Sequence, residues 1–409
     1  MFLQALQRRN PALIDAAIQL HQSGQLPPNT FVLDLDAITG NARALAEEAQ
    51  RHHLTVFAMT KQIGRNPDAC QAIIAGGIDA AVAVDIDCAR ATTRAGMKLG
   101  HVGHLVQIAG CDADQTAAMA PDFWTVFSDE KATEAARAAA RHGRDQALLA
   151  RIYAEGDEFY SGHEGGYPAE HILQVADRID ALDAAHFAGI TTFPALLHDR
   201  ATGSLRQTHN LRTLERAASA LAGAGRTFQI NGPGTTSAVA LSQLAAAGIT
   251  QVEPGHALTG STPPHAHDFD LPEIPAVCYL TEVSHTYAGR AYCFGGGMYV
   301  DPVFPDYDMH AVVASAPDRQ RLLPATVPPP SAIDYYGQIH GAGPTPAIGE
   351  SVVFGFRVQA FVTRAHTAGV AGISTGKPVV QGIWSADGLH RALTSHTDAD
   401  LPQNPTANP

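Results

Sequence analysis

Cysteine is scarce in this chain of 409 residues, and the cysteines present are not spaced for structural bonding. The five of them are odd in number and include no C-x-x-C pair: Cys70, Cys88, Cys111, Cys278 and Cys293. This is not the pattern of a disulfide framework or a zinc knuckle, and it predicts reduced thiols in the cytoplasm. The 20 histidines are scattered without an H-E-x-x-H spacing, so no metal site is predicted.

The sequence also lacks a long apolar run and an excess of basic residues. No stretch approaches the roughly 20 apolar residues that cross a bilayer. With 27 basic against 40 acidic residues, the formal net charge is -13. This charge argues against nucleic acid and anionic membranes as partners, and only a local site could bind phosphate. Charges interrupt the N-terminal apolar residues, so residues 1–27 predict an amphipathic helix with Asn10 as cap and Pro11 at its first position, not a signal peptide.

Eight short apolar runs alternate with helical stretches up to about residue 260. Continuous apolar strands between helices predict a parallel sheet covered on both faces, and eight units predict a closed (β/α)8 barrel over residues 28–262. An open doubly wound sheet is the rival fold, but no G-x-G-x-x-G follows the first strand. The predicted strands begin at Thr55, Asp79, His101, Phe123, Ala147, His186, Thr227 and Thr250.

The pattern changes after residue 262. Helical periodicity ends, and short alternating or β-branched runs separated by glycine and proline predict a mostly antiparallel β domain over residues 263–390. Residues 391–409 are polar and proline-rich, which predicts a disordered tail.

Three unusual segments stand at the ends of predicted strands one, seven and eight. Lys61 ends the first strand, "NGPGTTSA" from Asn231 ends the seventh, and "EPGH" from Glu253 ends the eighth. In a closed barrel these strands are neighbours, and functional groups collect at the carboxyl ends of the strands. We therefore expect the three segments to meet at one mouth.

The seventh-strand loop has the features of an anion site. Its turn is followed by hydroxyl residues and then a helix, so backbone N–H groups and the helix dipole predict a phosphate site. The expected contacts are Asn231, Gly234, Thr235 and Thr236 from this loop, with backbone donors of Gly255 and His256 beside it. An ordinary helix cap is the alternative, since Thr and Ser are favoured there.

Lys61 and Glu253 complete a set that suits pyridoxal 5'-phosphate. The amine would form a Schiff base, the loop would hold the phosphate, and the carboxylate would keep the pyridine nitrogen protonated. The alternatives are a surface charge for Lys61 and a hydrogen-bonded rim residue for Glu253.

Several motifs resemble those of the fold type III pyridoxal-phosphate enzymes, the alanine racemase-like barrels. "FVLDLDAITGNARAL", "VFAMTKQIG" and "VEPGHALTGS" are similar to the first strand and helix, the strand-lysine segment and the strand-eight motif of this family. The resemblance covers residues 28–262 and is strongest to the YhfX-like branch. It implies an amino acid as substrate, Lys61 as Schiff-base lysine and catalytic base, and a homodimer with shared active sites.

Two positions depart from the alanine racemase pattern. Alanine racemases place arginine at the position of Glu253, whereas decarboxylases of the same fold place glutamate there. Thr192 stands where the family has a histidine that supports the ring, and His104 or His198 is the expected substitute.

The resemblance also implies a second catalytic group from the β domain of the partner subunit. Tyr299 in "AYCFGGGMYVDP" is the candidate, with Tyr292 second, and a decarboxylase would use Cys293. In "IDYYG", Tyr335 or Tyr336 is expected to reach phosphate or substrate, and Tyr335 is preferred.

Racemisation is the expected reaction, and decarboxylation or a D-amino-acid lyase reaction is the alternative. A zinc-assisted lyase would need a His/Cys pair in the β domain, for which His285 and Cys293 are a weak match. A pyridoxal-phosphate carrier is a further alternative, although carriers are barrels alone. The acidic loop after strand five is expected to gate the substrate and not to bind a metal; its polar residues are Asp157, Glu158, His163 and Glu164.

Overall fold

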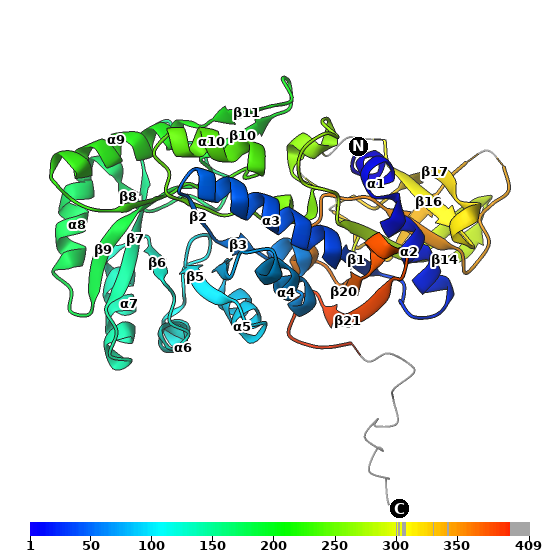
Figure 1. Cartoon of the computed structure of the whole chain (residues 1–409), viewed down its shortest axis with the longest axis horizontal. Coiled ribbons are helices and arrows are strands. Elements are labelled where there is room, and N and C mark those ends of the chain that lie inside the picture. Colours follow the sequence, from blue (N-terminus) through cyan, green and yellow to red (C-terminus); the bar gives the residue numbers. More distant parts are fainter. Residues whose placement is uncertain (300, 302, 305–307, 330, 342, 393–409) are drawn as a thin grey trace, which may run out of the picture.

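Eight parallel strand positions close into a barrel in the first two thirds of the chain (Figure 1). The computed structural model describes residues 1–299, 301, 303–304, 308–329, 331–341 and 343–392. The first position is split at Phe57 into two short strands, of which β2 pairs with β13 and β3 pairs with β4, so the ring closes there. The predicted barrel is therefore confirmed. Its strands are β2 (Thr55–Val56), β3 (Ala58–Met59), β4 (Ala80–Ala83), β5 (Lys98–Val102), β6 (Phe123–Val126), β7 (Gln146–Tyr153), β9 (Ala185–Thr191), β12 (Gln229–Asn231) and β13 (Gln251–Val252), with β8 (Tyr167–Pro168) beside β7.

Helices cover the outside of this barrel (Figure 1). Side-chain oxygens of Asp34, Asn66, Asp85, Ser128 and Thr208 accept backbone N–H groups at the starts of α3, α4, α5, α7 and α9, which explains where these helices begin. The helices are α3 (Leu35–Arg51), α4 (Pro67–Ala75), α5 (Ile86–Arg94), α6 (Ala113–Ala118), α7 (Asp129–Arg141), α8 (Ile172–Asp180), α9 (His209–Gly223) and α10 (Ala238–Ala246). A small hairpin of β10 (Leu196–Asp199) and β11 (Ser204–Gln207) stands between β9 and α9.

One barrel strand lies earlier than the sequence predicts. The strand expected to begin at His101 is β5, which covers Lys98–Val102. Lys98 and His101 interrupt its apolar character, whereas the residues after His104 are more apolar, and periodicity therefore placed the strand too late. His101 consequently stands at the carboxyl end of the strand, where barrel enzymes keep functional groups.

The C-terminal part is a mostly antiparallel β domain, as predicted. Six of its strands form a closed ring in the order β14, β15, β18, β17, β16, β19, because β14 pairs with both β15 and β19. The strands are β14 (Val277–Tyr287), β15 (Arg290–Phe294), β16 (His310–Ala314), β17 (Arg321–Thr326), β18 (Tyr336–Ile339), β19 (Ser351–Phe354), β20 (His366–Ala371) and β21 (Val379–Ser385).

An N-terminal strand also belongs to the β domain. β1 (Thr30–Asp34) pairs antiparallel with β14 and parallel with β20, although it lies within residues 28–262, which were expected to form the barrel. α3 then runs from this sheet to the first barrel strand (Figure 1). A buried apolar cluster contains Phe31 and Tyr279 of the sheet together with Ala58 and Ile63 of the barrel, so the two parts share a core.

Two helices stand where a single helix over residues 1–27 was expected. α1 (Phe2–Arg9) and α2 (Pro11–Gln22) are separated at Asn10, because the residue before a proline is disfavoured in helical conformation. Asn10 precedes α2 as expected, but its side-chain amide donates to Asp34 Oδ2 and the Pro275 carbonyl and does not cap the helix. Leucines of both helices pack on the β sheet.

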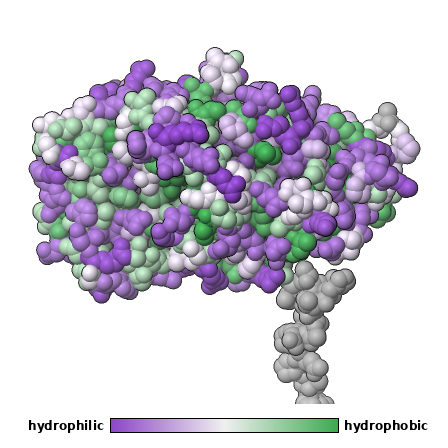
Figure 2. All heavy atoms as spheres, in the orientation of Figure 1, coloured by the Kyte–Doolittle hydropathy of each residue, from purple (hydrophilic) through white to green (hydrophobic). Residues whose placement is uncertain are grey.

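The surface and the C-terminal end can be compared with the partners and the tail predicted from the sequence. No helix among the described residues is both long enough and apolar enough to cross a membrane. The face drawn in Figure 2 is mainly hydrophilic, with hydrophobic residues scattered over it. Of the tail predicted over residues 391–409, only Arg391 and Ala392 lie within the described residues.

Candidate active site

A cavity of about 220 Å³ opens at the carboxyl ends of the barrel strands, where the β domain faces them. The barrel contributes Lys61, Glu253 and the loop after β12 to its lining. Tyr299, Arg357 and Gln359 line it from the β domain of the same chain. The three strand ends singled out from the sequence therefore do meet at one mouth.

Lys61 follows β3 and begins a single 3₁₀ turn, Lys61–Ile63, that ends at Gly64. Its Nζ lies 5.4 Å from the centroid of the Phe361 ring. Burial lowers the pKa of the Lys61 amine, the charge of Arg357 lowers it further, and Cys88 and Asp85 oppose the change. An amine with a lowered pKa is more often neutral, and the neutral amine is the nucleophile and the base.

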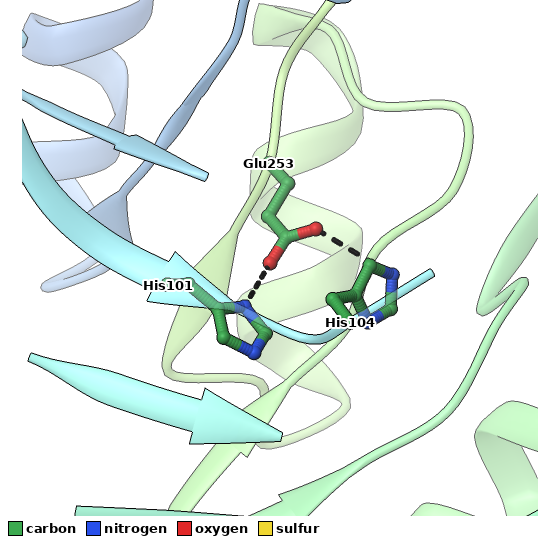
Figure 3. Close-up of side chains that lie close together, drawn as sticks. All are labelled: His101, His104 and Glu253. Carbon is green, nitrogen blue, oxygen red and sulfur yellow. Dashed lines mark hydrogen bonds and ion pairs between the residues drawn. The ribbon is translucent and has the colours of Figure 1, made fainter. Parts of the chain in front are cut away.

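Glu253 directly follows β13, and its side chain is 1% exposed (Figure 3). Its Oε1 accepts from His101 Nδ1 at 2.6 Å and from Asn231 Nδ2 at 2.9 Å. His101 Nε2 and the Thr125 hydroxyl share a hydrogen bond of 2.6 Å. Among the described residues, Oε2 accepts no hydrogen bond, and His104 Nε2 lies 3.6 Å from it.

The charges of this cluster are settled by its contacts. Burial alone would raise the pKa of Glu253, but the charges that the two histidines carry at the low pH where Glu253 titrates, together with the hydrogen bonds from His101 and Asn231, outweigh burial and bring the pKa to about 2. Burial lowers the pKa of His104 to about 3, against the opposing charge of Glu253. At neutral pH the cluster therefore presents an ionised carboxylate beside a neutral His104.

Gly103 explains how two histidines so close in sequence both face Glu253. Its φ of +79° lies in the left-handed region, and a Cβ there would stand 2.6 Å from the Thr125 carbonyl oxygen. Only glycine adopts this conformation without strain and fits this space. The chain can therefore turn directly after β5 and bring His104 back over the cavity.

The loop after β12 lines the cavity with Gly234, Thr235 and Thr236. One expected anion donor is already engaged, because the Thr235 N–H donates to the Leu196 carbonyl. At the start of α10, the Ala238 N–H donates to Glu273 Oε1 at 2.7 Å. The buried Glu273 therefore occupies the N-terminus of α10. Any phosphate here would depend on the remaining loop donors and not on the helix end.

The other predicted cofactor contacts from the barrel have different positions. Gly255 and His256 line the cavity beside this loop. The His256 ring turns toward the β domain, where its Nε2 donates to the Val358 carbonyl at 2.9 Å. Asn231 does not line the cavity and instead holds Glu253.

The β-domain tyrosines separate into two groups. Tyr299 lines the cavity of its own chain, whereas a partner subunit was expected to supply it. Tyr335 is 64% exposed, does not line the cavity and stands 5.9 Å from the Arg364 guanidinium. It precedes β18 on the outer surface of the β domain, so it is not a contact of its own chain's cavity.

The alternative cysteine and tyrosines of the β domain lie apart from the cavity. Cys293 is buried within β15, and burial raises its pKa to about 12. Tyr292 stacks on His285 with 4.7 Å between the ring centroids, and Tyr336 packs edge-on against the same His285.

The acidic loop after β7 reaches the cavity through His163, which lines it. Its acidic residues are engaged elsewhere, since Asp157 accepts from His209 and Thr213 and Glu158 pairs with Arg206.

Of the two substitutes for the missing family histidine, only His104 lines the cavity, where its ring lies edge-on to Phe193 at 5.8 Å. His198 stacks on His267 at 5.7 Å and is not part of the lining. Within the described residues, one group of side chains is close enough to share a metal ion, namely His101, His104 and Glu253, whose ligand atoms lie within 4.8 Å of one another.

Sequence reasoning missed several residues of the site. His101, which holds Glu253, was placed at the start of a strand and not at its end. Tyr160 and Phe193 lie in loops after β7 and β9 and line the cavity, with 5.6 Å between the centroids of their tilted rings. Their position after predicted strands was a usable signal, whereas nothing in the sequence indicated that Arg357 and Gln359 would enter the barrel mouth.

Comparison with known proteins defines the class first. Residues 33–263 match the model of the alanine racemase N-terminal domain, and residues 278–380 match that of the YhfX-like C-terminal domain. The chain is 39% identical over 391 residues to the protein named "Uncharacterized protein YhfX" of Escherichia coli strain K12, covering 95% of this chain and 99% of the relative. The chain therefore belongs to the family of alanine racemase-like proteins that carry a YhfX-like C-terminal domain.

Solved structures confirm the fold. D-threonine aldolase from Filomicrobium marinum has a TM-score of 0.67 at 17% identity, over 89% of this chain and 96% of that one. Alanine racemase of Clostridium difficile 630 in complex with cycloserine has a TM-score of 0.63 at 13% identity, over 88% and 98%. D-threo-3-hydroxyaspartate dehydratase from Delftia sp. HT23 has a TM-score of 0.63 at 16% identity, over 87% and 97%. An aldolase, a racemase and a dehydratase share this fold, so the reaction must be argued from the site.

Proposed function

We propose that this chain is a pyridoxal 5'-phosphate-dependent enzyme that abstracts the α-proton of an amino acid, with racemisation as its reaction. The observation that carries the proposal is the Glu253 carboxylate, which is ionised, fully buried and without a partner at Oε2 among the described residues. A buried anion is costly unless a cation or hydrogen-bond donor completes its environment. A protonated ring nitrogen would do so.

The other groups around the cavity fit the same cofactor. Lys61 supplies an amine whose pKa is lowered by burial, in the same cavity as the loop after β12. Gly234, Thr235, Thr236 and Gly255 would hold the phosphate through backbone N–H and hydroxyl groups. When bound, the cofactor would offer a carbonyl carbon to the lysine amine and an electron-withdrawing ring to the α-carbon.

Two side chains are suited to moving a proton on either face of the α-carbon. Lys61 would take the α-proton on one face. Burial raises the pKa of the Tyr299 phenol, so the phenol stays protonated at neutral pH and would return a proton on the other face. His101 and Asn231 would act as positioning residues, because they hold Glu253 and do not line the cavity.

Racemisation is favoured over a zinc-assisted lyase reaction by the residues that reach the cavity from the β domain. Among the described residues they are Tyr299, Val303, Arg357 and Gln359, which do not include the His/Cys pair that such a lyase would need. We also propose that the protein is a homodimer, as the family resemblance implies. The dimer is not needed to supply the described cavity lining, because Tyr299 and the other lining residues described above belong to one chain.

The test of the cofactor assignment is reduction of the purified protein with borohydride, followed by peptide mapping. Reduction should leave a pyridoxyl group on Lys61. A protein without bound cofactor, or with the label on another lysine, would refute the assignment.

A further inference from the structure

Arg357 brings a guanidinium into the cavity from the β domain. It follows β19, and its side chain is 15% exposed. Nη1 donates to the carboxylate of Asp301, which is 4% exposed. Within the part of the chain that the structure describes, the buried Nε has no hydrogen-bond partner, and neither does the side-chain oxygen of Gln359 two residues later.

The unpaired side of this guanidinium matches a carboxylate. Arginine carries five N–H donors in a planar fork, and the edge made by Nε and the second terminal nitrogen can hold both oxygens of a carboxylate. Asp301 engages the other edge and so fixes the orientation of the fork. An arginine held in this way is a preorganised anchor, because its fork is already oriented before binding.

The charge of Arg357 shifts the pKa values of several side chains that line the cavity. Burial raises the pKa of both Tyr160 and Tyr299, and the Arg357 charge opposes this effect in both phenols. The same charge lowers the pKa of the Lys61 amine. Arg357 therefore stands within electrostatic reach of the candidate base and of the candidate acid.

We propose that Arg357, oriented by Asp301, binds the α-carboxylate of the substrate amino acid and so makes the reaction one that keeps this carboxylate. The inference rests on the proposed function and narrows it. It gives Arg357 a role in substrate binding that the sequence did not indicate.

The consequence for the reaction follows from ground-state binding. A carboxylate held in a charge-assisted hydrogen bond loses that stabilisation if it leaves as neutral CO₂, which would raise the barrier to decarboxylation. The bond to break is then the α-carbon–hydrogen bond. Nζ of Lys61 would take its proton, and the electron pair left on the α-carbon is what an electron-withdrawing cofactor would stabilise when bound.

A phosphate is the other anion that Arg357 could bind. The loop after β12 and Gly255 already offer donors for a phosphate on the barrel wall. Moreover, Arg357 and Asp301 together carry no net charge, which suits a singly charged carboxylate better than a doubly charged phosphate. The experiment must separate these two sources.

Calorimetric titration of the purified full-length protein with propionate, propionamide and inorganic phosphate makes this separation. Wild-type protein should bind propionate and not the neutral propionamide. Arg357→Gln should weaken propionate binding by about 10- to 100-fold, as expected for a lost charge-assisted bond, and leave phosphate binding within about 3-fold. The propionate affinity of Arg357→Lys should lie between those of wild type and Arg357→Gln, because lysine keeps the positive charge but lacks the planar fork of donors.

Controls protect this test against unfolding. Arg364→Gln changes a 56%-exposed arginine of the same domain that pairs with Asp334, and it should leave propionate binding unchanged. If Arg357→Gln fails to fold because Asp301 is left buried without its partner, the double variant with Asp301→Asn removes both charges. This double variant should show the same loss of propionate affinity.

Propionate binding that is equal in wild type and in Arg357→Gln would overturn the proposal, as would a loss of phosphate affinity as large as the loss of propionate affinity. Labelling of Lys61 reports on the proposed function separately. A labelled Lys61 with Arg357-independent propionate binding would refute this inference alone. Arg357-dependent propionate binding without a labelled lysine would refute the proposed function and leave the carboxylate site standing.

Discussion

Glu253→Gln is the substitution whose effect on stability can be worked out from the structure. A glutamine has nearly the shape of a protonated glutamate, so the variant approximates the protein with Glu253 neutral. The folded protein holds the pKa of this carboxyl at about 2 against an ordinary value of 4.5. Since each pH unit corresponds to about 1.4 kcal/mol, the full lowering corresponds to about 3 kcal/mol, which is an upper bound at pH 7 because His104 is neutral there and its charge no longer stabilises the carboxylate.

The sign of the pH dependence follows from the lowered pKa. A carboxyl with a depressed pKa in the folded state stabilises the protein above its unfolded pKa, and this stabilisation is lost as the pH falls through the folded pKa. The variant should therefore be less stable than wild type at pH 7, by up to about 3 kcal/mol. The difference should shrink to about half near pH 3, which urea denaturation of both proteins at the two pH values measures.

The same variant tests the role in catalysis. The cofactor-loaded protein should exchange the α-proton of a substrate amino acid for deuterium about 10²-fold or more slowly than wild type, because a preorganised charge is removed from a closed site. Glu350→Gln is the matched control, since Glu350 is a largely buried carboxylate that pairs with Arg321 outside the cavity lining. A stability difference below about 0.5 kcal/mol at pH 7, with exchange near the wild-type rate, would refute this reasoning.

Two further predictions concern Tyr299 and Lys61. Because Tyr299 lines its own chain's cavity, mixing Lys61→Ala chains with Tyr299→Phe chains should restore no activity, whereas a tyrosine shared across a dimer would restore about a quarter of it. Burial lowers the pKa of Lys61, whereas the hydrogen bond that Lys98 donates to Asp79 raises the pKa of Lys98, so competitive acetylation of cofactor-free protein should titrate Lys61 at the lower pH. Equal midpoints for the two lysines would contradict the buried position of Lys61.

The parts of the site that the sequence predicts are those that follow directly from a strand. Lys61 and Glu253 each end an apolar run, and the closure of a parallel barrel brings such ends together whatever the details of packing. His101 was missed because β5 carries a lysine and a histidine and shows little apolar pattern. A shift of three residues in one strand was enough to hide His101, which donates to Glu253.

The β domain was less predictable for a physical reason. Strand pairing there joins segments far apart in the sequence, as when β1 pairs with β14 and β20. A short strand followed by a helix looks the same whether it pairs within the barrel or with another sheet. The entry of Arg357 into the cavity depends on how the β domain seats against the barrel, which no local pattern reports.

Mapping of the reduced protein tests the central claim most directly, because the chain has only four lysines: Lys61, Lys98, Lys131 and Lys377. Lys98 pairs with Asp79, and Lys131 bonds to Glu134 and the Ile108 carbonyl, so neither reaches the cavity. After borohydride reduction, the account predicts one pyridoxyl group per chain on Lys61, and none in the Lys61→Ala variant. A label on one of the other three lysines, or its persistence in Lys61→Ala, would contradict the account.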